Sequence, residues 1–318
     1  MVTLADTPLP HGISLACRHV AGPGPAAPRV LYLHGFPEAA FIWDGVMQRL
    51  APQAQGLAPN LRGFIGSSAP AEVAAYRPKH LVADIVALID AWGGPLDLLV
   101  AHDWGGAVAW NLAAQHPQLM KRLLIINSPH PATFLRELRH SAAQQAASAY
   151  MNFLCRPDAA ALLAADDHKR LWRLFGEAPW LTPEVRAQYR AAWTHPAGGM
   201  EGALNYYRAS PLRPPVTADD PLHTLVLPDD VVTVQVPTTV LWGDEDRALL
   251  PGLLDGLQHW VPQLQLQRVP GASHWIVHEQ PALVAGVVLG LLNAPPAVAV
   301  GVSAAAAPAP GSAPAACS

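Results

Sequence analysis

The sequence predicts an α/β protein that has a mostly parallel sheet and a long helical insertion. Two observations predict this fold class. In residues 1–130, short apolar runs alternate with segments of helical periodicity, which is the pattern of βαβ units. From residue 131 to about 232 the alternation stops, and the β pattern returns only afterwards. The 318 residues are 51% hydrophobic and 14% charged, so the chain can bury a large core and a wholly disordered protein is excluded.

Most of the expected strands are short apolar runs that end in a loop. Strands are predicted at residues 29–33, 57–59, 96–100, 122–126, 236–242 and 264–269. Helices are predicted at residues 78–92 and 105–115, between these strands. Residues 282–292 form an apolar run that begins after Pro281, which predicts a core helix because the run is too short to cross a membrane.

These patterns divide the chain into four parts. Residues 1–130 are expected to form the first part of an α/β core, and residues 131–232 a helical cap inserted into it. Residues 233–293 then complete the core. Residues 294–318 consist almost entirely of Ala, Pro, Gly, Ser and Val, and we expect a disordered tail there.

Charge and cysteine content exclude several classes of protein. The net charge of −4 argues against a nucleic-acid binder, which needs a basic surface. Cys17, Cys155 and Cys317 are far apart, so neither a disulfide framework nor a zinc site is expected. The N-terminus lacks a basic start followed by an apolar run, so no signal peptide is expected. We therefore expect a cytoplasmic enzyme that needs no membrane, metal or cofactor.

Residues 100–106 (VAHDWGG) follow an expected strand and open an expected helix. Small residues on both sides of Asp103 permit the sharp turn of a nucleophile elbow, which exposes the central side chain. A carboxylate at a helix N-terminus is favoured in its charged, nucleophilic form. Asp103 is therefore the candidate nucleophile. The alternative is that Asp103 only caps the helix.

Three further segments supply the other parts of such a site. The loop HGFPE at residues 34–38 follows the first strong strand, which assigns oxyanion donors to the backbone N–H groups of Phe36 and Trp104. Asp246 ends the acidic loop WGDED, in which Asp244 and Glu245 are the alternatives. His274 follows the next strand. The chain order is therefore nucleophile, acid and histidine.

These motifs resemble the α/β-hydrolase superfamily, and within it the epoxide hydrolase branch, which is related to haloalkane dehalogenases and uses an aspartate nucleophile. The resemblance covers roughly residues 10–293. The matching motifs are HGFPE at 34–38, NLRGFIGSSAP at 60–70, AHDWGG at 101–106, WGDED at 242–246 and GASHW at 271–275. The α/β-hydrolase fold is the fold that this resemblance implies.

The resemblance also implies two cap tyrosines whose hydroxyl groups hold the epoxide oxygen. The segment NYYR at residues 205–208 assigns one role to Tyr207, and AYMNFL at 149–154 assigns the other to Tyr150. Tyr206 is the alternative donor, and either residue could instead be an ordinary buried tyrosine. Trp104, Pro37 and His34 are expected to line the substrate pocket. His102 and His278 are interpreted as structural.

The expected reaction is hydrolysis of a small-molecule epoxide to a vicinal diol through an alkyl ester of Asp103. An apolar-rich cap favours an apolar or aromatic substrate, and the sequence is compatible with a homodimer. A haloalkane dehalogenase is the alternative, although Phe36 stands where an amide side chain would help to bind halide. A non-catalytic ligand-binding protein of the same fold would require a broken triad. The chain contains no G-x-S-x-G segment, which argues against a lipase or esterase.

Overall fold

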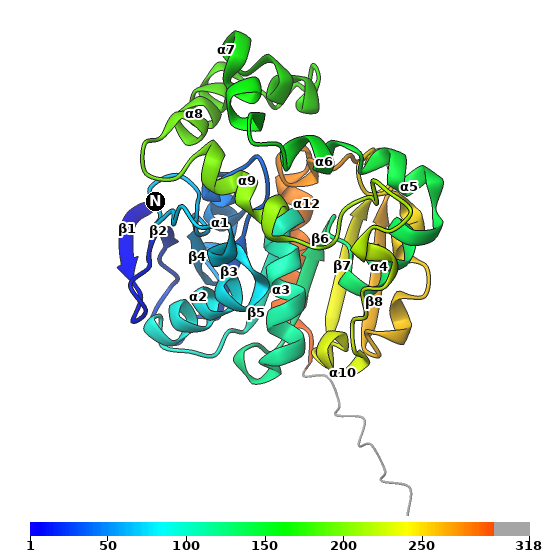
Figure 1. Cartoon of the computed structure of the whole chain (residues 1–318). Helices are drawn as coiled ribbons and strands as arrows, with labels where there is room; N and C mark the ends of the chain where they lie inside the picture. Colours follow the sequence, from blue (N-terminus) through cyan, green and yellow to red (C-terminus); the bar gives the residue numbers. More distant parts are fainter. Residues whose placement is uncertain (296–318) are drawn as a thin grey trace, which may run out of the picture.

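One eight-stranded sheet organises the computed structural model, which describes residues 1–295 (Figure 1). The strand order is β1-β2-β4-β3-β5-β6-β7-β8. β1 pairs with β2 and β2 with β4 in antiparallel fashion, and all other neighbours are parallel. The strands are β1 (Thr3–Pro8), β2 (Ser14–Val20), β3 (Arg29–Leu33), β4 (Gln55–Pro59), β5 (Leu98–His102), β6 (Leu123–Ile126), β7 (Thr238–Gly243) and β8 (Leu264–Val269).

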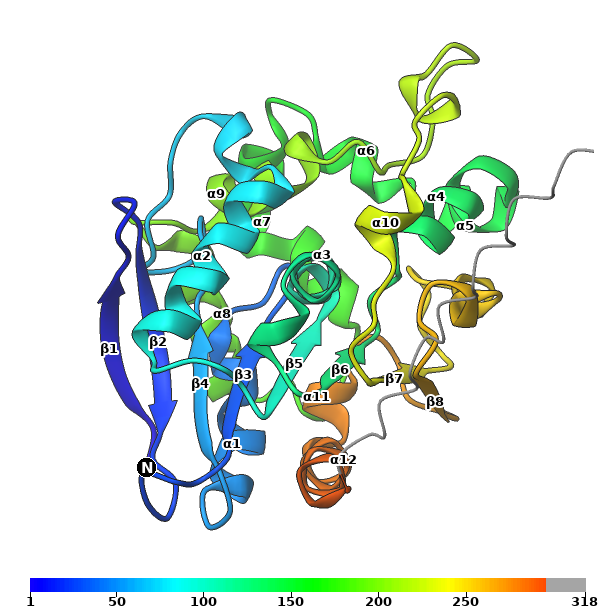
Figure 2. The same cartoon turned by 90° about the horizontal axis from the view of Figure 1, so that it is seen from below.

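Helices cover both faces of this sheet. The α-helices are α1 (Asp44–Leu50), α2 (Pro78–Ala91), α3 (Asp103–Gln115), α4 (Pro131–His140), α5 (Ala142–Ala147), α6 (Tyr150–Leu154), α7 (Ala159–Phe175), α8 (Pro183–Thr194), α9 (Met200–Ala209), α10 (Asp229–Val232), α11 (Ile276–Glu279) and α12 (Pro281–Asn293). Short 3-10 helices are η1 (Ala40–Trp43), η2 (Val73–Tyr76), η3 (Pro117–Leu119), η4 (Pro221–His223), η5 (Pro251–Leu254) and η6 (Leu257–His259). Figure 2 shows α2 and α3 on one face of the sheet and α1, α11 and α12 on the other.

The apolar runs of the parallel strands are explained by this double coverage. Successive residues of a strand point to opposite faces, so a strand that is covered on both sides needs apolar residues throughout. In β3, Leu31 and Leu33 join the core on the α2 and α3 face, whereas Val30 and Tyr32 join the core on the α1 and α12 face. The sheet therefore separates two hydrophobic cores.

The segment between β6 and β7 is helical, as its sequence predicts. All of its residues are described, and it contains α4 to α10 with 3-10 turns and loops but no strand. In Figure 1, α6, α7 and α8 lie together beyond one end of the sheet. Helix α7 is interrupted at Ala165–His168, where Asp166, Asp167 and His168 have φ angles of 53°, 52° and 62°. This break separates the second half of α7, which carries Arg170 and Arg173, from the first.

The structure corrects two details of the predicted core. The central strand spans Leu98–His102 and not residues 96–100. Its last residue, His102, is polar but buried, so the apolar run alone did not mark the end of the strand. The following helix begins at Asp103. Strands β1 and β2 were not predicted. β1 is almost entirely exposed at the edge of the sheet, so its sequence has no apolar run.

The expected core helix after Pro281 is confirmed as α12, which packs against α1 and buries Val284, Ala285 and Val288. Within residues 1–295, no helix is long and apolar enough to span a membrane. The tail predicted at residues 294–318 lies outside the described residues from 296 onward.

Candidate active site

Four loops meet at the edge of the sheet where the parallel strands end. Phe36 follows β3, Asp103 follows β5, Asp246 follows β7 and His274 follows β8. The carboxyl ends of parallel strands share one edge of a sheet, where open α/β proteins bind ligands. The structure therefore brings together residues that are up to 238 positions apart in the sequence.

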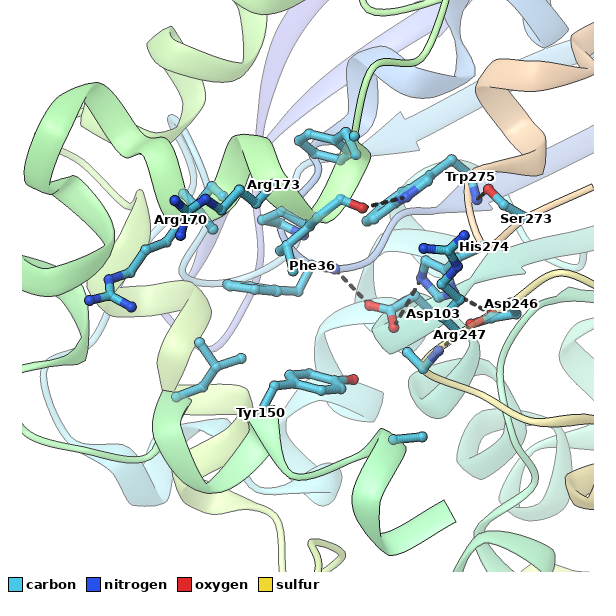
Figure 3. A pocket seen from close by; sticks show the side chains of 18 of the residues that line it. Phe36, Asp103, Tyr150, Arg170, Arg173, Asp246, Arg247, Ser273, His274 and Trp275 are labelled. Carbon is cyan, nitrogen blue, oxygen red and sulfur yellow. Dashed lines mark hydrogen bonds and ion pairs between the residues drawn. The ribbon is translucent and has the colours of Figure 1, made fainter. Parts of the chain in front are cut away.

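Asp103 lies at the turn between β5 and α3 with a φ of 49°, a value that is uncommon for a residue other than glycine. The turn needs small neighbours, because a Cβ atom at Gly105 would lie 2.5 Å from the carbonyl oxygen of Leu33. Helix α3 has no side-chain cap. Instead, Oδ1 of Asp103 accepts a hydrogen bond of 2.7 Å from the N–H of Phe36 (Figure 3). The geometry is that of a nucleophile elbow and not that of a simple helix cap.

Burial raises the pKa of Asp103 above its ordinary value. Positive charge on His274 and the N–H groups of Phe36 and Trp104 act in the opposite direction and favour the carboxylate. The two N–H groups assigned as oxyanion donors therefore both face the carboxyl group of Asp103.

His274 lies between two carboxylates. Its Nδ1 atom is 2.6 Å from Oδ2 of Asp246, and its Nε2 atom is 3.7 Å from Oδ2 of Asp103. Burial alone would lower the pKa of His274, but the two carboxylates, Asp246 more than Asp103, raise this pKa to about 9. The imidazole is therefore protonated at neutral pH in the ligand-free site.

Among the three acidic residues of the WGDED loop, Asp246 is the one that contacts His274. Its Oδ1 accepts hydrogen bonds of 2.9 Å from the N–H groups of Ala248 and Leu249. Burial would raise the pKa of Asp246, yet His274 and these donors hold it below its usual value. Asp244 instead pairs with Arg268, and Glu245 is exposed.

The side chain of Asn127 was not singled out from the sequence, although it supports the acid. Its Nδ2 donates to Oδ2 of Asp246 at 2.8 Å, and its Oδ1 accepts from the N–H of Gly243 at 2.9 Å. Asn127 follows β6, the strand between the nucleophile and acid strands, and has a φ of 39°. The sequence signal that could have identified Asn127 is a polar residue at the end of a strand, next to a proline-containing loop.

Tyr150 of α6 and Tyr207 of α9 line the same cavity as Asp103. Their ring centroids are 6.2 Å apart, and the ring of Tyr207 packs edge-on against Phe36. Burial raises the pKa of both phenols far above the ordinary value, and the negative charge of Asp103 adds to this effect. Both hydroxyl groups therefore remain protonated. Tyr206, the alternative donor, points elsewhere and donates to the carbonyl oxygen of Arg62 at 2.9 Å.

The cavity has a volume of about 730 Å³. Pro37 lines it, as predicted, but His34 and Trp104 are not among its lining residues. The ring of His34 is fully buried below the loop: its Nε2 accepts from the N–H of Leu61, so its Nδ1–H donates to the carbonyl of Gly35. The ring of Trp104 instead packs edge-on against the rings of Tyr206 and Tyr207.

A buried polar cluster lies beside the site, and the sequence had suggested no role for two of its members, Glu38 and Tyr189. Glu38, the last residue of HGFPE, contacts Nδ1 of His102 at 2.9 Å and accepts from the hydroxyl of Tyr189 on α8 at 3.0 Å. The Nε2 atom of His102 lies 2.9 Å from the carbonyl oxygen of His274. His278 lies 2.8 Å from the hydroxyl of Tyr189. The cluster connects the HGFPE loop, the end of β5, the loop after β8 and helix α8, in agreement with structural roles for His102 and His278.

No group of His, Cys, Asp or Glu side chains within residues 1–295 has an arrangement that could hold a metal ion. The polar side chains that line the cavity carry carboxylates, an imidazole, phenols, guanidinium groups and the hydroxyl of Ser273. This set can perform nucleophilic and acid–base chemistry.

Comparison with known proteins agrees with this geometry. Residues 28–281 match the family described as alpha/beta hydrolase fold. The chain therefore belongs to the α/β-hydrolase family. It is 32% identical over 299 residues to an epoxide hydrolase of Caballeronia sordidicola, with 79% of this chain and 86% of the relative covered.

Solved structures give the same result. A Bacillus megaterium epoxide hydrolase in complex with an inhibitor superposes with a TM-score of 0.82 at 29% identity, covering 91% of this chain and all of the other. An epoxide hydrolase from metagenomes of hot environments also gives 0.82, at 34% identity, covering 92% and 99%. Within the family, the chain thus lies in the epoxide hydrolase branch, and the predicted fold and resemblance are confirmed.

Proposed function

We propose that this protein hydrolyses an epoxide to a vicinal diol through a covalent ester of Asp103. The observation that carries the proposal is the set of side chains that share one cavity: an aspartate at the elbow, with the phenols of Tyr150 and Tyr207 beside it. A carboxylate can attack an sp³ carbon, and an epoxide oxygen needs a proton donor when it leaves. The names of the relatives and solved neighbours support the same reaction.

The first step is attack on the epoxide. A carboxylate oxygen of Asp103 forms a bond to one ring carbon while the bond from that carbon to the epoxide oxygen breaks. Tyr150 and Tyr207 hydrogen-bond the oxygen as negative charge develops on it, and the oxygen becomes a hydroxyl when it takes up a proton. The product of this step is a neutral ester on Asp103.

The loss of the Asp103 charge in that step turns His274 into the base that the next step needs. In the free site, Asp103 carries one negative charge and the His274 imidazole one positive charge, because the pKa of His274 is about 9. Esterification removes the charge of Asp103, which lowers the pKa of His274. The new hydroxyl gains one proton and His274 loses one, so His274 becomes a neutral base without net proton exchange with solvent.

The second step is hydrolysis of the ester. His274, oriented by Asp246, removes a proton from water, and the resulting hydroxide attacks the carboxyl carbon of Asp103. The N–H groups of Phe36 and Trp104 stabilise the oxyanion. The bond between that carbon and the ester oxygen, which came from Asp103, then breaks. This oxygen takes the proton of the added hydroxyl group and leaves as part of the diol, while Asp103 keeps one oxygen from water and His274 stays protonated.

The helices between β6 and β7 act as the cap over this chemistry, and the cap favours an apolar or aromatic substrate body. Apolar side chains from core and cap face the cavity: Phe36, Phe153, Leu154, Leu163, Leu171, Phe175 and Trp275.

Cys17 and Cys155 are free thiols, which supports a reducing compartment such as the cytoplasm.

A haloalkane dehalogenase would use the same Asp103 and His274 but has no need of two phenol donors. Incubation with a panel of epoxides and alkyl halides separates the two reactions. We expect diol from epoxides. Halide release from alkyl halides, with epoxides left intact, would favour the dehalogenase. Reversible binding of both substrate types without any turnover would favour a non-catalytic ligand-binding protein.

A further inference from the structure

The cavity has two chemically different ends (Figure 3). Asp103, His274 and the exposed Arg247 lie at one end, and Arg170 and Arg173 extend from α7 on the opposite side. Phe36 and Tyr150 lie between these ends. A molecule whose reacting carbon faces Asp103 would therefore pass along aromatic side chains before it reaches the two guanidinium groups.

The acidic residues of the cavity do not neutralise these arginines. Within residues 1–295, no carboxylate lies within ion-pair distance of Arg170 or Arg173. The acidic lining residues come from loops and helix ends outside the segment between β6 and β7. Asp246 contacts His274, and Glu279 accepts hydrogen bonds from Ser273. Glu245 is exposed next to Asp246. Elsewhere in the cap, Arg156 and Arg190 do pair, with Asp158 and Asp167.

One of the two guanidinium groups is held in place by an aromatic contact. The Cζ atom of Arg170 lies 5.7 Å from the ring centroid of Phe153, which itself lines the cavity. A cation over an aromatic ring is attracted to the ring face, and this contact uses none of the N–H groups of Arg170 as hydrogen-bond donors. Such donors bind carboxylate or phosphate oxygens in a bidentate manner.

We propose that Arg170 and Arg173 determine substrate specificity by binding an anionic oxygen group at the far end of the epoxide substrate. The substrate class is an epoxide that is joined through an apolar body to a carboxylate or a phosphate. This inference rests on the proposed epoxide hydrolysis and adds the second point at which the substrate is held. Both arginines are exposed, so the anionic group can stay in contact with solvent while the body is buried.

The test compares three series of terminal epoxides with alkyl chains of increasing length. The chains end in a carboxylate, in a phosphate, or in a primary amide as the neutral isostere of the carboxylate. For the wild-type enzyme we expect a higher kcat/KM for an anionic series than for the amide series at matched length. In the Arg170→Gln, Arg173→Gln double variant, we expect kcat/KM for the preferred anion to fall by about tenfold or more relative to kcat/KM for the amide of matched length. The anion that loses more identifies the group that is bound.

Arg186→Gln is the matched control. Arg186 is a cap arginine that stacks on Trp172 at 5.0 Å and does not line the cavity, so its variant should keep the wild-type preference. Equal kcat/KM for anions and amides in the wild type, or an anion preference that survives in the double variant, would overturn the inference while epoxide hydrolysis stands. Absence of diol from every epoxide, including the amides, would instead overturn the proposed function.

Discussion

The Nε2 atom of His274 lies 3.7 Å from Oδ2 of Asp103, beyond the length of a direct hydrogen bond but close enough for strong electrostatic attraction. This separation suits a reaction in two steps. The imidazolium stabilises the carboxylate before it attacks the epoxide. After esterification, the same nitrogen is within reach of a water molecule placed at the carboxyl carbon of Asp103.

His274→Gln should accumulate the ester instead of preventing its formation. Asp103 and the phenols remain in place in this variant, so the first step proceeds, but no base is left to activate water. Intact-protein mass spectrometry after addition of an epoxide should show the mass of the enzyme plus that of the substrate. A variant that turns over at the wild-type rate would show that His274 is not the base.

Tyr207→Phe should slow epoxide opening by on the order of 10²-fold or less, because Tyr150 remains as a donor. The Tyr150→Phe, Tyr207→Phe double variant should lose alkylation of Asp103 almost completely. Rapid-quench measurement of ester formation gives the rate of this step alone. Tyr206→Phe is the matched control, since that hydroxyl bonds to a backbone carbonyl outside the cavity. Normal epoxide opening in the double variant would contradict the assignment.

Stability should fall with rising pH because of the pair formed by His274 and Asp246. The pKa of His274 is about 9 in the folded protein, above its ordinary value of 6.5. A raised pKa in the folded state contributes stability below pH 6.5, and this contribution is lost as the pH rises through 9. Asp246→Asn removes the larger of the two carboxylate effects on His274, so relative to this variant the wild type should lose up to about 3 kcal/mol of unfolding free energy between pH 6.5 and 9. Denaturant titrations of both proteins at the two pH values measure this difference; parallel pH dependence of the two would refute it.

Gly35→Ala should inactivate the enzyme because the new Cβ atom would overlap the carboxylate of Asp103. Displacement of the nucleophile by about 1 Å can cost on the order of 10²-fold in rate. Gly45→Ala is the control, since the nearest atom to its Cβ would be 3.5 Å away. Steady-state kinetics should separate the two variants, and thermal unfolding should show whether Gly35→Ala is still folded. Full activity of a folded Gly35→Ala variant would contradict the assigned geometry.

The fold and the reacting residues could be predicted because their signals are local. Phe36, Asp103 and Asp246 each follow an apolar run. His274 follows a strand in which apolar and polar residues partly alternate, and parallel strands bring all of these positions to one edge of a sheet. The edge strand β1 could not be recognised in this way, because an exposed strand needs no apolar pattern.

Contacts between segments that are far apart in the sequence could not be predicted either. The pairing of Glu38 with Tyr189 joins residues 151 positions apart, and no local pattern in the sequence indicates it. The position of Arg170 and Arg173 at the cavity depends on where the second half of α7 lies after its break at Ala165–His168. Side-chain direction also explains why His34 was wrongly expected in the pocket: its ring points below the loop, toward Leu61.

The central claim is that Asp103 itself supplies an oxygen atom to the diol, and one isotope measurement tests this claim directly. With enzyme in excess over epoxide in ¹⁸O-water, the diol from the first turnover should contain little ¹⁸O, because its new oxygen comes from the Asp103 carboxylate. After many turnovers, the peptide that contains Asp103 should carry the label. A first-turnover diol fully labelled from solvent, with Asp103 unlabelled, would show that water attacks the epoxide directly and would contradict the covalent mechanism.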